Sequence, residues 1–344
     1  MEKKSHHYVP QFLLKNFSEN KKSIGMFINS NSKFIKQASI KKQACKDYLY
    51  GKNKEIEDML MIIETHASSL IRSIIQSITL PKLYSEEYNL LMLFILLSEA
   101  RVQKQADTNE KLITELMRVS AKMYKEHGRL DVPDEAIDNL QVTYDVPNLY
   151  SMKAAVELYP ILLDLKTVIL IIDNDRYFIT SDRPIVRYNY MYVKRNYKFN
   201  GYGLGNMGIQ IFFPISPKHC IYIFDDIMYQ SKVIDENKIV LSRGTYVDEL
   251  NKLFYLNSYK YLFFNEKTKE SYIRRLVENL KHDNSLNKEL VQFGSSSNKL
   301  IMQQVNYVKE YIKMPFLSIN PKLINMPLPQ HTAGPIRPYA QKFY

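Results

Sequence analysis

The chain has 344 residues, of which 45% are hydrophobic and 24% are charged, so we expect a globular protein of one large domain or two interlocked ones. The formal net charge is +11, and residues 1–54 carry twelve lysines against three acids, a local charge of +9. This basic segment favours a polyanionic partner, nucleic acid before an anionic membrane, although the compositional bias of an AT-rich genome also explains an excess of lysine.

The cysteine content and the apolar runs bear on the compartment. Cys45 and Cys220 lie far apart, which argues against a disulfide framework or a cysteine zinc site and fits a reducing environment. The start of the chain has no stretch suited to a signal peptide. The longest apolar run, Leu90 to Leu97, is far shorter than the roughly 20 residues that span a bilayer. We therefore expect a cytoplasmic protein without a membrane segment.

Two adjacent histidines, His6 and His7, precede Pro10 and an apolar, helix-like run. A neutral imidazole can act as a base, a metal ligand or a hydrogen-bond relay. Pro10 suits the first turn of a helix, because its missing N–H costs nothing there. The alternative is that both histidines only cap a helix at a frayed terminus. Gln11 and Lys15 of the predicted helix are candidate substrate-binding residues.

Apolar residues recur at helical spacing between residues 54 and 165, which predicts a mainly helical half. Glu64 lies at the edge of one apolar stripe, as a metal ligand or as a solvated or ion-paired carboxylate. Arg101 ends a buried row, where a guanidinium needs a protein carboxylate or a bound phosphate. The predicted helices span residues 54–76, 85–107, 108–127 and 151–165, and a loop with a short helix, which suggests an insertion or lid, spans 129–150.

The period changes after residue 166 and predicts an antiparallel sheet built from residues 167–224. Ser181 and Asp182 follow a predicted strand over 176–180 and precede a proline turn, a common location for functional groups. An Asx turn, in which the carboxylate only satisfies local N–H groups, is the open alternative. The GxGxxG sequence at 203–208 is not interpreted as a nucleotide loop, because the residues after it alternate like a strand.

A long helix is predicted over 246–264, with Asn251 beside its apolar face. Its tyrosines and lysines suit either packing on the sheet, which we favour, or base stacking and phosphate contacts. Two further helical stretches are expected over 266–314. The last 30 residues hold six of the fourteen prolines, so this tail is expected to be extended and to become ordered along a surface or a partner.

Together these elements predict an α+β fold, in which a helical half packs on a mainly antiparallel sheet and a C-terminal helical extension follows. The predicted domain organisation is a single α+β domain over 1–265 (helical part 54–165, sheet part 167–264), a helical extension over 266–314 and a Pro-rich tail over 315–344. The tail is the expected contact for a protein partner or a second copy.

The order of these landmarks resembles a bacterial family, domain of unknown function 4238. The matching segments are His6–Phe17 (HHYVPQFLLKNF, against HHYVPQFYLRxF), Phe178–Val186 (FITSDRPIV, against FxTSDNPV), Phe213–Cys220 (FPISPKHC, against a PLSP strand) and Val247–Asn251 (VDELN, in a helix with a retained Asn). This chain has Arg183 where the family usually has Asn. The resemblance covers residues 5–265 and implies no settled activity, but the mobile and conflict-associated contexts of its members imply an antiphage defence or toxin-like role.

The leading hypothesis is a metal-dependent nuclease or another phosphodiesterase acting on nucleic acid with Mg²⁺ or Mn²⁺. The alternatives are a non-catalytic sensor or binding module of a defence system and a hydrolase of a small nucleotide with residues 108–150 as its lid. The hypothesis requires His6 and Asp182 to meet in one cleft. The predicted catalytic residues are His6, His7, Asp182 and Arg101, the substrate-binding residues Gln11, Lys15, Ser181 and Asn251, and the metal ligands His7, Glu64 and Asp182.

Overall fold

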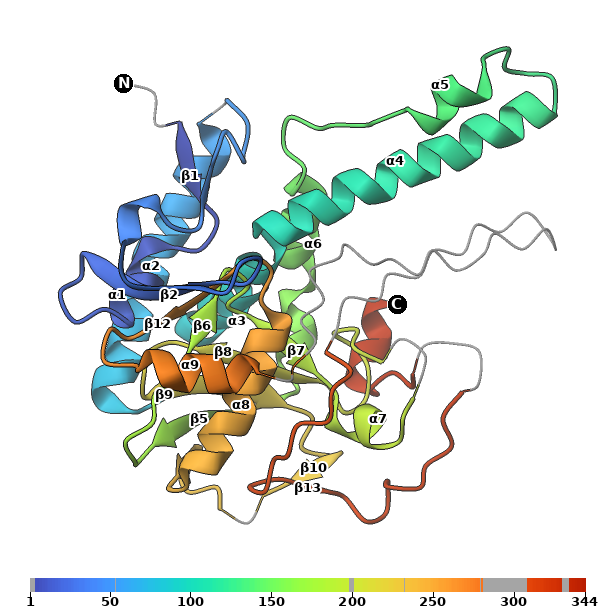
Figure 1. The fold of residues 1–344 in the computed structure, drawn as a ribbon. Helices are drawn as coiled ribbons and strands as arrows, with labels where there is room; N and C mark the ends of the chain where they lie inside the picture. Colours follow the sequence, from blue (N-terminus) through green and yellow to red (C-terminus); the bar gives the residue numbers. More distant parts are fainter. Residues whose placement is uncertain are drawn as a thin grey trace.

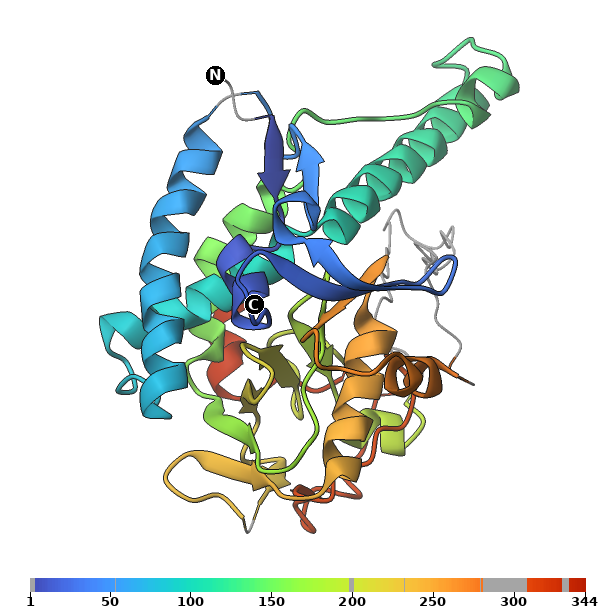
Figure 2. The same ribbon diagram turned by 60° about the vertical axis from the view of Figure 1, so that its left-hand side comes forward.

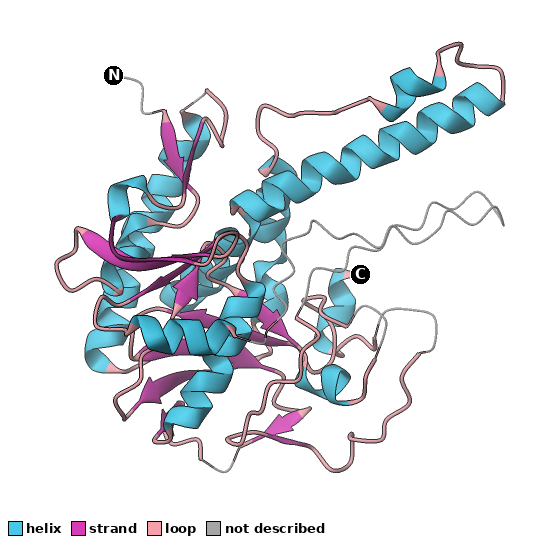
Figure 3. Ribbon diagram, viewed as in Figure 1, coloured by secondary structure: helices cyan, strands magenta, loops and turns pink. Residues whose placement is uncertain are grey.

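The structure is a computed structural model that describes residues 4–52, 54–197, 201–231, 233–278, 280, 308–329 and 334–344. Strands occupy the centre of the molecule and helices surround them (Figures 1 and 3). Most strand pairs are antiparallel, so the expected α+β class is confirmed. Among the described residues, no helix is both long and apolar enough to cross a bilayer.

The larger sheet has five strands in the order β11-β5-β9-β8-β7. Its strands are β5 (Lys166–Ile172), β7 (Val186–Tyr188), β8 (Gln210–Pro214), β9 (His219–Phe224) and β11 (Lys238–Leu241). Only the β11–β5 pair is parallel among them. Every residue of β8 is buried, because both faces of this sheet are covered. The predicted sheet over 167–224 therefore forms most of this element.

The second sheet has the order β3-β2-β12-β6 and joins two strands from the first 40 residues to two strands from much later in the chain. Its strands are β2 (Ser23–Ile28), β3 (Lys33–Ser39), β6 (Thr180–Ser181) and β12 (Tyr261–Phe264). A Cβ atom at Gly25 would lie 2.3 Å from the ring of Phe264, so only glycine allows β12 to pack against β2 at this point. Two short ribbons pair β1 (Ser5–His7) with β4 (Cys45–Asp47) and β10 (Tyr229–Gln230) with β13 (Ser318–Ile319).

The helices differ in how they are buried. Helix α3 is apolar around most of its circumference and lies in the core, and Ser85 caps it by accepting a hydrogen bond from the Tyr88 amide at 3.2 Å. Helix α4 leaves the body, and α5 folds back along it (Figure 1). The helices are α1 (Gln11–Asn16), α2 (Glu55–Ser77), α3 (Glu86–Ala100), α4 (Gln103–Glu126), α5 (Asp134–Asp138), α6 (Leu149–Leu158), α7 (Tyr190–Lys194), α8 (Gly244–Asn257) and α9 (Glu270–Val277), with 3₁₀ turns η1 (Ile40–Lys42), η2 (Tyr159–Leu162) and η3 (Tyr339–Phe343).

The predicted junction between two helices at residue 107 is wrong, because α3 ends at Ala100 and α4 begins at Gln103. Val102 between them is extended, with φ −71° and ψ 156°, and its carbonyl accepts a hydrogen bond from Asn148 Nδ2 at 3.3 Å. Arg101 turns its side chain toward the N-terminal segment. Arg101 lies at this break between α3 and α4, and apolar spacing alone did not indicate it.

The predicted strand over 176–180 is wrong in extent, since only its last residue enters β6. Asn251 of α8 replaces the missing strand partner. Its Oδ1 accepts a hydrogen bond from the Ile179 amide at 3.0 Å, and its Nδ2 donates one to the Tyr177 carbonyl at 2.9 Å. A side-chain amide that satisfies both kinds of backbone group makes ladder pairing unnecessary there.

The predicted helix over 246–264 is also wrong in extent. Helix α8 ends at Asn257, Ser258 is extended, and the chain continues into strand β12. The amides of Tyr259 and Lys260 donate hydrogen bonds to Asp182 instead of continuing the helix. The last four predicted helical residues are therefore the strand that joins the two ends of the second sheet.

The C-terminal tail lies on this chain's own body. Arg337 is 1% exposed, and its Nε and Nη2 donate hydrogen bonds to the two carboxylate oxygens of Asp164 at 2.9 and 3.0 Å. The same guanidinium donates to the carbonyls of Ile161 and Leu204, both at 2.7 Å. The predicted ordering of the tail along a surface thus uses this chain's own surface, and its predicted contact with a partner or second copy stays a prediction.

The described part of the predicted extension over 266–314 packs on the same core as the preceding domain. Helix α9 contacts α8 and buries Ile273 and Leu276. The second predicted helical stretch falls largely on residues 281–307, which lie outside the described residues. The predicted domain boundary at residue 265 stays a prediction.

Replacing Arg337 with methionine should lower the free energy of unfolding by about 3–5 kcal/mol, because Asp164 and two buried carbonyls then lose their donor. Urea unfolding followed by circular dichroism measures this change. Arg129→Met is the matched control, since Arg129 is exposed beyond the end of α4 and the substitution should cost no more than about 0.5 kcal/mol. Equal unfolding midpoints for R337M and the wild type would contradict the role of Arg337 as a buried anchor.

Candidate functional site

A cleft of about 500 Å³ lies between the N-terminal segment and α2, which run beside each other in Figure 2. We call it the N-terminal cleft. Pro10, with φ −55° and ψ 134°, turns the chain from β1 into α1 and so brings Gln11 beside His7. Polar groups that line the cleft include His7, Gln11, Tyr50, Glu57, Glu64 and Arg72.

Arg101 lies behind this cleft and is 2% exposed. Its Nη2 donates hydrogen bonds to Glu64 Oε1 at 2.6 Å and to the His7 carbonyl at 2.9 Å, and its Nε donates one to the Tyr8 carbonyl at 3.3 Å. Burial lowers the pKa of Arg101, but Tyr50 and Glu64 raise it above its ordinary value, so the guanidinium stays charged. The anion that the sequence required is supplied by Glu64. Arg101 therefore contacts Glu64 and backbone carbonyls, and it does not project into solvent as a phosphate clamp.

His6 is 4% exposed and has a protein partner at each ring nitrogen. The Tyr50 amide donates a hydrogen bond to His6 Nδ1 at 3.1 Å, so the ring proton lies on Nε2, which is 3.3 Å from Glu57 Oε2. The imidazole also stacks on the Tyr50 ring, with centroids 5.5 Å apart and planes inclined by 11°. The structure thus places His6 inside the fold, where it joins β1 to α2.

His7 faces the cleft, because successive side chains of strand β1 point to opposite sides. Its Nε2 lies 3.3 Å from the Lys41 carbonyl, and Gln11 Nε2 lies 3.5 Å from its Nδ1. The two imidazoles therefore lie on opposite sides of β1, with His6 inside the fold and His7 at the cleft, and their predicted catalytic roles stay predictions. The pairing of β1 with β4 holds this segment in the extended conformation in which neighbouring side chains point to opposite sides.

Asp182 is 2% exposed and holds the loop between α8 and β12. Its two carboxylate oxygens accept hydrogen bonds from the amides of Tyr259 at 2.8 Å and Lys260 at 2.7 Å. Burial raises the pKa of Asp182 to about 6, although these amide bonds favour its charged form. Ser181 Oγ bonds both the amide and the carbonyl of Arg183. Ser181 thus makes a local turn, whereas Asp182 bonds distant amides and does not form the Asx turn of the structural alternative.

The remaining predicted site residues do not gather at one place. Asn251 is fully buried and bonds the backbone before β6, as described above, whereas Lys15 is exposed on α1 and lines a neighbouring pocket. The predicted metal ligands are also separated, because His7 and Glu64 line the N-terminal cleft while Asp182 bonds the loop after α8. Within the described ranges, no group of three or more His, Cys, Asp or Glu side chains is placed to hold a metal ion.

The sequence analysis did not predict several polar residues of the cleft, among them Tyr50, Glu57 and Arg72. Glu57 had a usable signal, since it precedes Glu64 by two helical turns and so lies on the same face of α2. Tyr50 and Arg72 had none, because their places depend on how the N-terminal segment packs on α2.

The model of a family described as "Protein of unknown function (DUF4238)" matches residues 5–268, which confirms the resemblance. No curated protein and no solved structure matches the chain. The opening motif of the resemblance forms β1 and α1, and the TSD segment forms β6 and the turn after it.

Substituting the two histidines separately tests their different places. His6→Ala should lower the free energy of unfolding by about 2–4 kcal/mol, because it removes the ring stack and leaves the Tyr50 amide buried without an acceptor. His7→Ala should cost no more than about 1 kcal/mol. Chemical denaturation of both variants measures the difference. Equal losses for the two variants would contradict the assignment of His6 to the core and His7 to the cleft.

The raised pKa of Asp182 makes a separate prediction. The pKa of Asp182 is about 6 in the folded state and about 3.9 in an unfolded chain, so the folded state binds the carboxyl proton more tightly. Proton binding therefore stabilises the folded wild type at pH 4, and this stabilisation is lost as the pH rises through 6. Asp182→Asn removes this titration. The unfolding free energy of the wild type minus that of D182N should therefore fall by about 2–3 kcal/mol between pH 4 and pH 7.

Urea unfolding at pH 4, 5, 6 and 7 measures this difference, and Asp226→Asn, at an exposed carboxylate, is the matched control. A difference between wild type and D182N that stays constant over this range would show that burial does not raise this pKa.

Proposed function

Because the chain belongs to the family described as Protein of unknown function (DUF4238), whose description gives no activity, we propose from its own geometry that it is a nucleic-acid-binding protein. In this proposal the lysines of the N-terminal segment contact the phosphodiester backbone. The protein binds without cleavage as its primary activity. This is the binding-module alternative of the sequence hypothesis, and the predicted defence role and cytoplasmic location stay predictions.

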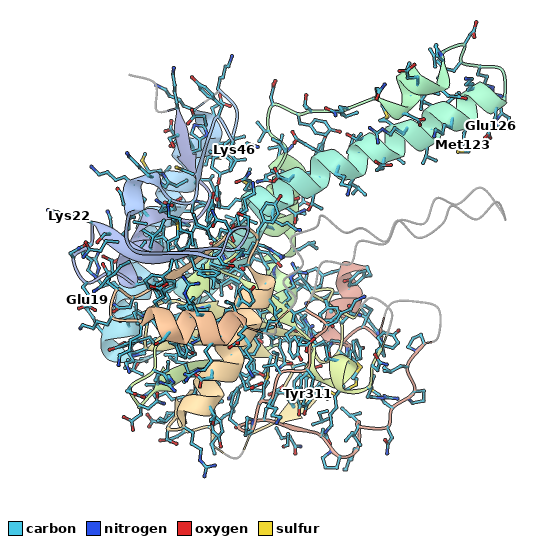
Figure 4. The ribbon with its side chains drawn as sticks, viewed as in Figure 1. Glu19, Lys22, Lys46, Met123, Glu126 and Tyr311 are labelled. Carbon is cyan, nitrogen blue, oxygen red and sulfur yellow. The ribbon has the colours of Figure 1, made fainter. Side chains whose placement is uncertain are left out.

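The exposed lysines carry this proposal. Eleven of the twelve lysines in residues 1–54 lie among the described residues, and all eleven are exposed. Pairing of β1 with β4 sets His6 opposite Lys46, the Tyr48 amide bonds the Lys4 carbonyl, and the Lys41 carbonyl contacts His7. These contacts bring Lys4, Lys41, Lys42 and Lys46 to one ribbon, and we call their exposed side chains the lysine face; Lys46, which Figure 4 labels, also lies 3.8 Å from Asp107 Oδ1 of α4. Clustered exposed lysines attract a polyanion independently of its sequence.

The state of the predicted catalytic groups supports binding over cleavage. Both ring nitrogens of His6 and of His7 contact protein groups, and both oxygens of Asp182 accept backbone hydrogen bonds. A general base must have a lone pair within reach of the proton that it abstracts. Of the two acids in the N-terminal cleft, Glu64 is already paired with Arg101, and Glu57 adds a negative charge that repels a phosphate. The electrostatically favourable surface for a backbone phosphate is the lysine face.

The double variant K41Q/K42Q tests the lysine face. Binding to a labelled 20-nucleotide duplex, measured by fluorescence anisotropy between 50 and 200 mM salt, should weaken, and the slope of log K against log salt should become shallower by roughly 0.9 for each lost phosphate contact. K153Q/K309Q is the matched control, because it removes two exposed lysines outside the N-terminal segment. Equal slopes for the two double variants, or no binding by the wild type at 50 mM salt, would contradict the proposal.

Phosphodiester hydrolysis in the N-terminal cleft is the second candidate. One observation favours it: His7, Gln11 and Glu64 line the same cleft, close to the Lys41 carbonyl on the lysine face. If the cleft cleaves nucleic acid, wild type and K153Q should cut a labelled single strand, and His7→Ala and Gln11→Ala should not, with all four keeping the same melting temperature. Intact substrate with the wild type, in buffer with and without Mg²⁺ or Mn²⁺, would leave binding as the activity.

A further inference from the structure

A second cavity, of about 240 Å³, lies where α4 begins, and we call it the α4 pocket. Helices α3, α4 and α6 and the segment from Arg183 to Arg187 line it, and Figure 1 shows α4 leaving the body beside α6. Its lining includes three cationic side chains, Lys104, Arg183 and Arg187, and one acid, Glu99, which is paired with Arg187. The pocket therefore carries a net positive charge inside the protein.

The N-terminus of α4 adds to this positive potential. The helix has 24 residues, and Val102 at its N-cap provides no side-chain hydrogen bond to the first turn. The Gln105 amide donates to the Val102 carbonyl at 3.1 Å, and the first turn as a whole carries the positive end of the helix dipole. Val102, Lys104 and Gln105 all line the pocket, so this end of α4 faces it. Such an end suits an anion, above all a phosphate.

A buried hydroxyl points to a ligand independently of the helix end. Thr108 lines the α4 pocket and is 1% exposed, and its Oγ1 has no hydrogen-bond partner among the described residues. A buried polar group without a partner costs about 1–3 kcal/mol, and such groups are rare in folded proteins. A ligand oxygen in the pocket would accept a hydrogen bond from this hydroxyl.

Protein contacts hold the cationic groups at the edge of the pocket. Arg187 donates hydrogen bonds to Glu99 through Nε at 2.9 Å and through Nη2. Arg183 Nη1 donates to the Asn257 carbonyl at 3.0 Å, and Lys104 Nζ lies 4.8 Å from the centre of the Tyr259 ring. Charges that are fixed before binding lose little freedom when a ligand arrives. The other walls are apolar and include Leu96, Ala154 and Leu158.

We propose that the α4 pocket binds a small organic phosphate. The phosphate lies at the N-terminus of α4 between Lys104 and Arg183, the Thr108 hydroxyl donates to one of its oxygens, and the organic part packs on Leu96 and Ala154. A cavity of this size is slightly below the roughly 300–1,000 Å³ of sites for drug-sized ligands, so it suits a mononucleotide or a smaller molecule and not a nucleic-acid strand. The α4 pocket has no lining residue in common with the lysine face, and the proposal does not depend on the proposed function.

Isothermal titration calorimetry of the full chain with AMP, UMP, inorganic phosphate and adenosine tests the proposal. AMP or UMP should bind more tightly than inorganic phosphate, because the apolar walls contact only an organic ligand, and adenosine should bind at least 10-fold more weakly than AMP. Thr108→Val replaces the hydroxyl with a methyl group of similar shape. The variant should keep or raise the melting temperature of the free protein, because it removes the unpartnered hydroxyl, and should weaken AMP binding about 10-fold or more.

Lys122→Gln, at the far end of α4, is the matched control and should bind AMP like the wild type. K41Q/K42Q should also keep AMP binding, so failure of the α4 pocket and failure of the lysine face give different results. The proposal is overturned if none of the four probes binds at millimolar concentration, if T108V binds AMP as tightly as the wild type, or if adenosine and AMP bind equally. A pocket-filling variant, Ala154→Phe, should abolish AMP binding, and unchanged binding by A154F would also overturn the proposal.

Discussion

The buried guanidinium of Arg101 is the constraint on which the N-terminal half of the molecule depends. A charge that is 2% exposed must find acceptors, and it finds them in Glu64 on α2 and in the carbonyls of His7 and Tyr8. Arg101 lies at the break between the two helices, where α3 ends at Ala100 and α4 begins at Gln103. The ion pair between Arg101 and Glu64 therefore lies between two sites. Glu64 lines the N-terminal cleft, and Val102, next to Arg101, lines the α4 pocket where α4 begins.

Patterns local in sequence predicted much of the fold. Apolar periodicity located α2 and most of the larger sheet, and the buried row of α3 correctly required an anion for Arg101. Contacts between distant segments decided the rest. Asp182 bonds amides 77 and 78 residues away, and the His6 ring accepts from an amide 44 residues away. Local chemistry shows that such groups need partners, but it does not show whether a substrate or the chain itself supplies them. For His6 and Asp182 the chain does.

The two proposed anion sites use different physics. The lysine face consists of flexible, exposed cations, whose attraction for a polyanion is collective and is screened by salt. The α4 pocket instead holds a few cations in place beside a helix end and an apolar wall, so its selectivity depends on shape and on directed hydrogen bonds. Arg183 links this pocket to the fold, because it follows Asp182 in the turn that closes on Tyr259. A change in that turn would therefore move a wall of the pocket.

The anchor of the C-terminal tail affects how the chain is completed during translation. Arg337 and Asp164 are 173 positions apart in the sequence. Ile161 and Leu204, whose carbonyls accept hydrogen bonds from Arg337, are also translated long before it. In a nascent chain on the ribosome, the Asp164 carboxylate and these two carbonyls therefore have no Arg337 to bind until that residue has emerged. A truncated chain that ends before Arg337 leaves these acceptors without their donor, and it would be a substrate for chaperones and for proteolytic quality control.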